Sequence, residues 1–334
     1  MAINTTMQLT DQFNRKINYM RISVTDRCDF RCIYCMSEQM NFLPKNQLLT
    51  LEEINRIATI FISMGVEKIR ITGGEPLVRK NVDTLFDKLS KNKDLKELTL
   101  TTNASQLLKK AGMLKASGIK RINISLDSLN PLNFKKMTRT GDLNKVLDGI
   151  EYAISIGLKQ LKLNTVIMKG INDHEIFDLI EFAIKKNIDI SFIEEMPLGT
   201  TEFSRKSTFT SNDEILEKIK TNYLIDKIEY RTGGPAEYWQ ILGTKSRIGL
   251  ISPHSHNFCE DCNRVRISCK GELFLCLGQD DKIELMPLLR KYPNNDQPIK
   301  DAILNSMEIK PKSHEFNLDQ SKPAVVRFMS HTGG

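Results

Sequence analysis

Short runs of alternating polar and β-branched residues are separated, along much of the chain, by longer segments whose apolar residues recur at helical spacing. The runs with the period of a strand are residues 20–25, 68–72, 97–102, 121–126, 161–167 and 190–194. Two of the helical segments, 50–64 and 211–221, open with a capping box, in which a Thr or Ser precedes a Glu by three residues. Six strand–helix units in succession predict a parallel sheet or barrel.

Each expected strand is polar on one face and mostly Ile, Leu and Val on the other, because successive side chains point to opposite faces. The polar positions are Arg21, Ser23, Thr25, Arg70, Thr72, Thr99, Thr101, Asn123, Ser125, Asp127, Lys162 and Asn164. Covering helices require the apolar face, so the polar face must look inward. A closed eight-stranded barrel has an apolar interior, so the pattern favours an incomplete (β/α)6 TIM-like barrel around a polar, anionic ligand. The alternative is a sheet with one solvated face, but parallel sheets are usually covered on both faces.

The alternation ends near residue 225, and the segment "RTGGPAEYW" at 231–239 is rich in turn residues. We therefore expect two domains, a partial barrel over 1–225 and a smaller C-terminal domain over 226–334. The first twenty residues contain no apolar signal-peptide core and no run is long enough to span a bilayer, so a cytoplasmic protein without a membrane partner is expected. The net charge of +7 fits an anionic ligand or simply a solvated Lys-rich surface, and no nucleic-acid partner is expected.

Six of the seven cysteines form two tight groups, Cys28, Cys32 and Cys35 and then Cys259, Cys262 and Cys276. Structural disulfides are rare in cytosolic chains, and the remaining Cys269 is best explained as a small buried residue. The first group follows the first strand directly, at the end of a barrel where active sites lie. Three thiolates can hold an iron–sulfur cluster and leave one iron open for chemistry, as three protein ligands do for catalytic zinc. A zinc site or a chance cluster is the alternative.

The second group is ambiguous by itself, because a zinc site completed by His254 or His256 would have the same cysteines. The segment "NRVRIS" at 263–268 favours another ligand. It predicts a strand that places Arg264 and Arg266 on one face, and the rigid guanidinium fork is suited to phosphate. A solvated basic face is the alternative for either arginine alone.

The C-x3-C-x2-C loop with Tyr34 before its last cysteine, followed by "ITGGEP" at 71–76, resembles the radical S-adenosylmethionine superfamily. The segments "MRISVTDRC", "GGPAEYW" and "CEDCNRVRIS" and the terminal Gly333-Gly334 resemble the GTP 3',8-cyclase family within it, over nearly the whole chain. This resemblance implies two [4Fe-4S] clusters, each with one open iron. The first would bind S-adenosylmethionine as a cosubstrate, and the second would bind the guanine of GTP.

The resemblance also implies roles for single residues. The cosubstrate contacts would be Tyr34, Gly74, Ser125 and Met196. The GTP contacts would be Arg21, Arg70, Thr101, Lys162, Arg264, Val265 and Arg266. In this family a Gly-Gly tail reaches into the barrel beside the substrate, so Gly333 and Gly334 are expected to have a catalytic role. An arginine often precedes "FIE" of the sixth strand in the family, whereas this chain has Ser191, so one contact is missing or replaced.

The implied reaction converts GTP to (8S)-3',8-cyclo-7,8-dihydroguanosine 5'-triphosphate, the first step of molybdenum cofactor biosynthesis. It begins with removal of hydrogen from ribose C3' and joins C3' to guanine C8. Expected partners are an electron donor such as flavodoxin or ferredoxin, cyclic pyranopterin monophosphate synthase as the recipient of the product, and a second copy in a homodimer. Two other functions remain open: another radical enzyme with auxiliary clusters, acting on peptides or RNA, and a non-enzymatic electron-transfer or zinc-binding regulator.

Overall fold

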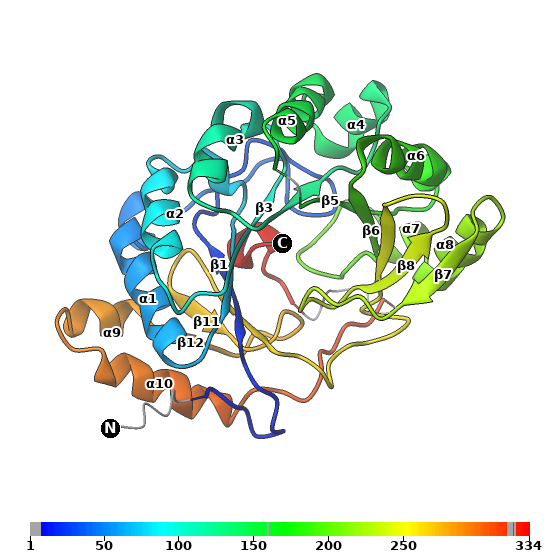
Figure 1. Ribbon diagram of the computed structural model, residues 1–334. Helices are drawn as coiled ribbons and strands as arrows, with labels where there is room; N and C mark the ends of the chain where they lie inside the picture. Colours follow the sequence, from blue (N-terminus) through cyan, green and yellow to red (C-terminus); the bar gives the residue numbers. More distant parts are fainter. Residues whose placement is uncertain (1–7, 159, 319–322, 324) are drawn as a thin grey trace.

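The six expected strands form the centre of one curved sheet, in which every neighbouring pair is parallel (Figure 1). The computed structural model describes residues 8–158, 160–318, 323 and 325–334. The central strands are β1 (Tyr19–Ser23), β2 (Lys68–Thr72), β3 (Glu97–Thr102), β4 (Arg121–Ser125), β5 (Leu161–Val166) and β6 (Asp189–Ile193). The six predicted strands are therefore confirmed within one or two residues at each end.

The C-terminal part of the chain extends this sheet at both edges. A parallel strand is added beside β1 and another beside β6, and antiparallel strands follow outward, in the order β12-β11-β10-β1-β2-β3-β4-β5-β6-β9-β8-β7. The added strands are β7 (Ile225–Ile228), β8 (Glu237–Ile241), β9 (Arg247–Ile251), β10 (Arg264–Ile267), β11 (Glu272–Phe274) and β12 (Lys282–Glu284). The mixed, unclosed sheet confirms the expected partial barrel and the strand at 263–268. The domain boundary at residue 225 stays a prediction.

Helices cover the outer face of the barrel, and the C-terminal end of the chain lies inside the ring of strands (Figure 1). The α-helices are α1 (Leu51–Ser63), α2 (Val82–Ser90), α3 (Leu107–Ala116), α4 (Pro131–Thr138), α5 (Leu143–Ser155), α6 (Ile176–Lys186), α7 (Arg205–Thr208), α8 (Asn212–Lys220), α9 (Met286–Lys291), α10 (Gln297–Met307) and α11 (Met329–Thr332). Short 3-10 turns are η1 (Lys45–Gln47), η2 (Pro76–Val78) and η3 (Asp173–Glu175).

The apolar face of the sheet forms the main core against these helices. Ile69, Ile71, Leu98 and Leu100 of neighbouring strands are at most 4% exposed and belong to one contiguous apolar cluster with helix residues such as Phe61. Each fully buried side chain of this size contributes about 1.5–3 kcal/mol relative to an exposed one. This outward packing leaves the polar face of every central strand for the barrel interior.

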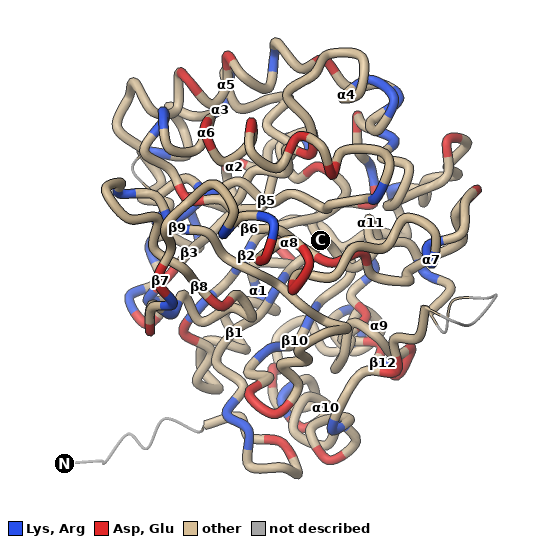
Figure 2. Tube along the Cα trace, turned by 90° about the vertical axis from the view of Figure 1, so that its right-hand side faces the viewer, with Lys and Arg blue, Asp and Glu red and all other residues tan. Residues whose placement is uncertain are grey.

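Charged residues of both signs are interspersed along the trace, without a long stretch of one sign (Figure 2). No helix in the described ranges is both long and apolar enough to cross a membrane.

Helix α1 begins where the sequence signal places it. Thr50 Oγ1 accepts a hydrogen bond from the Glu53 backbone N–H at 3.1 Å, and Glu53 Oε2 accepts one from the Thr50 N–H at 2.8 Å. Both donors would otherwise be unpaired at the helix start. The same reciprocal pair, Ser211 and Glu214, opens α8, so both predicted capping boxes are confirmed.

We predict that Thr50→Ala lowers the free energy of unfolding by about 1 kcal/mol, because it removes the side-chain acceptor at the N-cap. The matched control is Thr59→Ala on the exposed side of the same helix. Thr59 Oγ1 only donates to the Asn55 carbonyl oxygen one turn earlier, so this change should be neutral or slightly stabilising. Urea unfolding of the metal-free protein measures both. Equal destabilisation by the two variants would contradict the capping role.

Candidate active site

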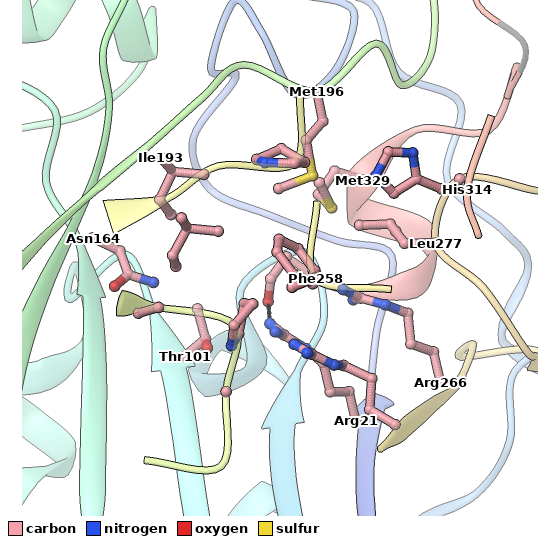
Figure 3. A pocket seen from close by; sticks show the side chains of 18 of the residues that line it. Arg21, Thr101, Asn164, Ile193, Met196, Phe258, Arg266, Leu277, His314 and Met329 are labelled. Atoms are coloured by element: carbon pink, nitrogen blue, oxygen red, sulfur yellow. Dashed lines mark hydrogen bonds between the residues drawn. The ribbon is translucent and has the colours of Figure 1, made fainter. Parts of the chain in front are cut away.

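One cavity occupies the barrel interior and is lined by residues from both parts of the chain (Figure 3). Arg21, Thr101 and Asn164 enter it from the central strands, and Arg266 and Phe258 enter it from the C-terminal part. Figure 3 shows the guanidinium groups of Arg21 and Arg266 on the same side of the cavity. The polar interior expected from strand alternation is therefore the wall of this cavity.

The basic wall of the cavity is built by strand register. β1 lies between β10 and β2, and Arg21 is aligned with Arg266 on one side and with Arg70 on the other. Two residues earlier, Tyr19 is aligned with Arg264 and Lys68. Because residues two apart share a face, these six side chains form a compact patch of five cations and one phenol. We refer to Tyr19, Arg21, Lys68, Arg70, Arg264 and Arg266 as the cationic patch.

Most of these cations lack an acidic partner in the described part of the chain. Only Lys68 pairs with a carboxylate, that of Glu97 at 2.8 Å. The Nε atoms of Arg21 and Arg264 are buried and have no hydrogen-bond partner among the described residues. Like charges directly opposite each other across strands are unfavourable, and unpaired buried donors are costly. The patch is therefore suited to an anion with several oxygen atoms.

Burial and the repulsion between neighbouring cations also shift the pKa values in the cationic patch. Burial lowers the pKa of Arg21 to about 10 and that of Arg266 well below its usual value, and neighbouring arginines add to both shifts. Burial alone would raise the pKa of Tyr19, but Arg70, Arg21 and Lys68 together lower it to about 7. The Tyr19 hydroxyl accepts a hydrogen bond from Arg70 Nε at 2.7 Å. Tyr19 therefore loses its proton more readily than an ordinary tyrosine, because the cations around it favour the phenolate.

The last residues of the chain bring main-chain oxygens to the cationic patch. Arg266 Nη1 donates to the Gly333 carbonyl oxygen, Arg21 Nη2 donates to the Gly334 oxygen, and Thr72 Oγ1 donates to the same Gly334 oxygen at 3.1 Å. Gly333 has φ +80°, and a Cβ added there would lie 2.1 Å from Thr72 Cγ2. Only glycine fits this close approach without displacing its neighbours.

The first cysteine group lies on the loop that follows β1, and the Gly-Gly-Glu-Pro turn supports it from behind. A Cβ added to Gly74 would lie 2.3 Å from the Arg27 carbonyl oxygen, so this close packing requires glycine. Buried Glu75 accepts hydrogen bonds from Leu77 N, Thr102 Oγ1 and Asn103 N. Asn103 Nδ2 in turn lies 3.6 Å from Cys28 Sγ. The turn therefore fastens the end of β3 to the cysteine loop.

Acidic groups surround the first cysteine group. Burial is the main cause that raises the pKa of Cys35 to about 12 and that of Cys32 well above its usual value, and Asp127 adds to both. Burial and the charge of Glu75 raise the pKa of Cys28 in the same way. Without a cation these thiols keep their protons, and binding of metal would release them.

Three of the four residues expected to contact the cosubstrate line the cavity. They are Tyr34, Ser125 and Met196, whereas Gly74 lies behind the cysteine loop and is not part of the cavity wall. The Tyr34 hydroxyl donates to Asp127 Oδ2 at 2.7 Å, and burial raises the pKa of Asp127 to about 6. All seven positions expected to contact the substrate line the cavity, and so does Gly334.

The second cysteine group lies in the cavity wall, with Cys259, Cys262 and Cys276 all lining it. The two histidines of the zinc alternative have other partners, since His254 Nε2 is 3.0 Å from the Glu195 carbonyl oxygen and His256 Nε2 is 2.8 Å from Asp213 Oδ1. Among the described residues no three His, Cys, Asp or Glu side chains are placed to hold a single metal ion.

This geometry fits iron–sulfur clusters better than zinc. A zinc ion needs its ligands to converge on one point, whereas each thiolate of a four-iron cluster binds a different iron. The sulfur atoms also have the N–H donors common around clusters, with Phe30 N 3.4 Å from Cys28 Sγ and Lys310 Nζ 3.5 Å from Cys262 Sγ. We conclude that both groups suit a cluster with three protein ligands.

Several wall residues were not identified from the sequence. Tyr19 and Lys68 share the alternation that marks Arg21 and Arg70, so the period of two could have found them. Phe258, His314, Phe316 and Met329 also line the cavity, but they lie in loops or in a short helix and carry no local signal. Ser191 is fully buried, its hydroxyl has no partner in the described ranges, and it does not line the cavity.

Two family models match the chain. The model of the Radical SAM superfamily matches residues 22–183, and the model named Molybdenum Cofactor Synthesis C matches residues 188–316. The GTP 3',8-cyclase of Ectopseudomonas mendocina is 50% identical over 330 residues, covering 98% of this chain and 99% of the relative. That of Pseudomonas savastanoi pv. phaseolicola is 52% identical over 328 residues, covering 98% of both chains.

A solved structure shares the fold at low sequence identity. Streptococcus suis SuiB bound to S-adenosylmethionine superposes with a TM-score of 0.60 at 17% identity, covering 95% of this chain and 78% of that chain. This likeness supports the partial-barrel architecture.

We predict that Gly333→Ala releases residues 329–334 from the cationic patch, because the new Cβ would overlap Thr72 and the positive φ is unfavourable for alanine. Gly334→Ala is the matched control, since a Cβ there comes no closer than 3.3 Å to Met329 Cγ. Amide hydrogen exchange of the terminal peptide should become faster in Gly333→Ala and change little in Gly334→Ala. Equal exchange in the parent and in Gly333→Ala would show that the tail is not held by this contact.

Proposed function

The chain belongs to the GTP 3',8-cyclase family of the radical S-adenosylmethionine superfamily, and we propose that its cavity binds both substrates of that reaction between the two cysteine groups. The enzyme converts GTP to (8S)-3',8-cyclo-7,8-dihydroguanosine 5'-triphosphate, the first step of molybdenum cofactor biosynthesis. Its cofactors are two [4Fe-4S] clusters, and S-adenosylmethionine is its cosubstrate. When loaded, the first cluster and S-adenosylmethionine supply the 5'-deoxyadenosyl radical that removes hydrogen from ribose C3'.

At the side of the cavity that Tyr34 lines, the loop after β1 would hold the first cluster through Cys28, Cys32 and Cys35. Tyr34, Ser125 and Met196 then bind the cosubstrate. Asp127 fixes the Tyr34 hydroxyl by the 2.7 Å hydrogen bond and so orients the ring at the cavity wall. Unlike these three residues, Gly74 does not line the cavity. Because it has no side chain, it lets the supporting turn pack against the cysteine loop.

The cationic patch binds the triphosphate of GTP. Arg21, Arg264 and Arg266 contribute guanidinium donors, two of which have an unpaired Nε. Lys162 and Thr101 extend this surface along β5 and β3, and Val265 lies in the wall between the two arginines of β10. Cys259, Cys262 and Cys276 hold the second cluster beside this patch, where it would bind the guanine base.

The terminal glycines complete the wall of the substrate site. Gly333 and Gly334 direct their main-chain oxygens at Arg266 and Arg21, which orients these side chains before GTP enters. A preoriented site places C3' where the radical forms and keeps water away from it. The tail thus has a positioning role in the proposal.

A single observation supports the proposal most directly. Three arginines in register on adjacent strands face a cavity whose wall includes the second cysteine group. The triphosphate of a nucleotide would supply the anionic partner that these arginines lack. Its base could at the same time reach the second cysteine group.

Three further partners belong to the proposal. The reaction takes electrons from outside the chain, and we propose a flavodoxin- or ferredoxin-type donor. The product would pass to cyclic pyranopterin monophosphate synthase. We also propose that the chain forms a homodimer.

We predict that anaerobically reconstituted protein holds about eight irons per chain, as two four-iron clusters. Cys28→Ala should leave about four irons and abolish cleavage of S-adenosylmethionine. Cys276→Ala should also leave about four irons, but some 5'-deoxyadenosine should still form without cyclised product. Cys269→Ala is the matched control, because this buried thiol lies outside both groups, and it should keep both clusters. Stoichiometric zinc in protein purified without oxygen would contradict the two-cluster assignment.

We predict that Arg264→Ala or Arg266→Ala weakens binding of GTP more than binding of guanosine, because the lost partner is phosphate. A hydrogen bond to a charged group contributes about 1.5–3 kcal/mol, so the dissociation constant for GTP should rise roughly tenfold to a hundredfold. Calorimetry with both ligands on reconstituted protein measures the difference. Equal losses for GTP and guanosine would assign these arginines to folding or to cluster assembly.

A further inference from the structure

The charges around the two cysteine groups differ, although the first group also has one cation, Arg31, whose Nη1 donates to the Cys28 carbonyl oxygen at 2.6 Å. Asp29, Glu75 and Asp127 lie around the first group, where Asp29 accepts a hydrogen bond from Asn103 at 2.8 Å beside Cys28. The second group instead has Arg15, Arg264 and Lys310 nearby, and the two carboxylates of its own loop, at 260 and 261, are exposed to solvent. A cluster in the second group would therefore sit in a more positive environment than a cluster in the first.

Lys310 is the most unusual of these cations. Its side chain is 1% exposed, although lysine is almost never fully buried unless it is paired. Lys310 Nζ donates to the Leu275 carbonyl oxygen at 2.6 Å and to Cys262 Sγ at 3.5 Å, and it has no carboxylate partner among the described residues. An ammonium buried without an anion is strongly disfavoured. The position makes sense if negative charge is bound at the cysteines.

A clamp from the N-terminal segment holds Lys310 at this position. Arg15 Nη1 donates to the Cys259 carbonyl oxygen at 2.7 Å and to the Lys312 carbonyl oxygen at 2.8 Å, and Arg15 Nη2 donates to that of Pro311 at 2.6 Å. Asp11 Oδ2 orients Arg15 through a 2.7 Å ion pair. Gln12 Nε2 donates to the Lys310 carbonyl oxygen at 3.1 Å. The backbone around Lys310 is thus tied directly to the cysteine loop.

We propose that Lys310 is a positioning residue for the second cluster, a built-in cation that donates to a ligand sulfur and stabilises the reduced cluster. The inference rests on the proposed function only in assuming that Cys259, Cys262 and Cys276 hold a cluster. Net charge, hydrogen bonds to sulfur and solvent exposure set the reduction potential of such clusters. Reduction adds one negative charge, which a buried ammonium next to a ligand stabilises. Lys310 therefore raises the potential of the second cluster above the value it would have without the cation.

The test is a redox titration followed by electron paramagnetic resonance in full-length protein that carries Cys28→Ala, Cys32→Ala and Cys35→Ala, so that only the second cluster is observed. Lys310→Met removes the charge and keeps the length of the side chain, and Lys310→Arg keeps the charge. Lys312→Met is the matched control, because this exposed lysine lies two residues away on the same segment. Iron content is measured for every variant.

We expect Lys310→Met to shift the one-electron reduction equilibrium about tenfold toward the oxidised form, which corresponds to a potential lower by about 59 mV. Lys310→Arg and Lys312→Met should keep the parent potential. In metal-free protein, Lys310→Met should leave Tm unchanged or raise it, because it removes an unpaired buried charge.

An unchanged potential in Lys310→Met would overturn the proposal. If Lys310→Met does not assemble the cluster, Lys310→Gln is titrated in its place. Assembly in Lys310→Arg but in neither neutral variant would support the need for a cation, whereas failure of Lys310→Arg as well would assign Lys310 to folding. A parent background without about four irons would instead contradict the proposed second cluster itself.

Discussion

Like charges held in register on adjacent parallel strands are the constraint on which much of this structure depends. Arg266, Arg21 and Arg70 cannot separate without breaking the sheet, because the backbone ladder fixes their spacing. Among the described residues no Asp or Glu pairs with them. Their acceptors are the Tyr19 phenol, the Leu100 carbonyl oxygen, the Thr101 hydroxyl and the main-chain oxygens of Gly333 and Gly334. The low pKa of Tyr19 and the inward course of the tail both follow from this shortage. A bound triphosphate would supply the missing negative charge.

The parts of the fold that were predicted from the sequence depend on short-range rules. Strand alternation identified all six central strands and their inward polar face, and the capping boxes located the starts of α1 and α8. Pairing between distant segments has no such local signal. Nothing in the local pattern around Arg264 shows that β10 lies beside β1. Only the family resemblance, which gives Arg21 and Arg266 as contacts of one ligand, brings the two together. Lys310 was missed for the same reason, since its significance comes only from its burial and from its contact with Cys262.

The contrast between the two cysteine groups follows from what each has to hold. Cleaving a sulfonium bond requires a strong reductant, and the carboxylates around the first group favour the oxidised form of a cluster and so lower its potential. The second group lies beside the cationic patch, since Arg264 is two residues from Cys262, and the proposed function requires positive charge there to bind phosphate. In the proposed function, substrate recognition and control of cluster charge therefore use neighbouring cations. Arg264 contributes to both, because it lines the cavity and lowers the pKa of Cys262.

The C-terminal part of the chain is an integral part of the barrel, because it supplies part of the cationic patch and the tail that contacts it. Strand β10 contributes Arg264 and Arg266 to the cationic patch, and the final residues reach back to Thr72 and to the cysteine loop, where the Ser330 backbone donates to Cys35. Without this segment the six central strands would retain Arg21, Lys68 and Arg70 but would lose the other two of the five cations, the second cysteine group and the tail. Both parts of the chain therefore contribute cations to the patch and residues to the cavity wall. Because both parts belong to a single continuous sheet, the backbone ladder fixes the arginines of β10 relative to those of β1 and β2.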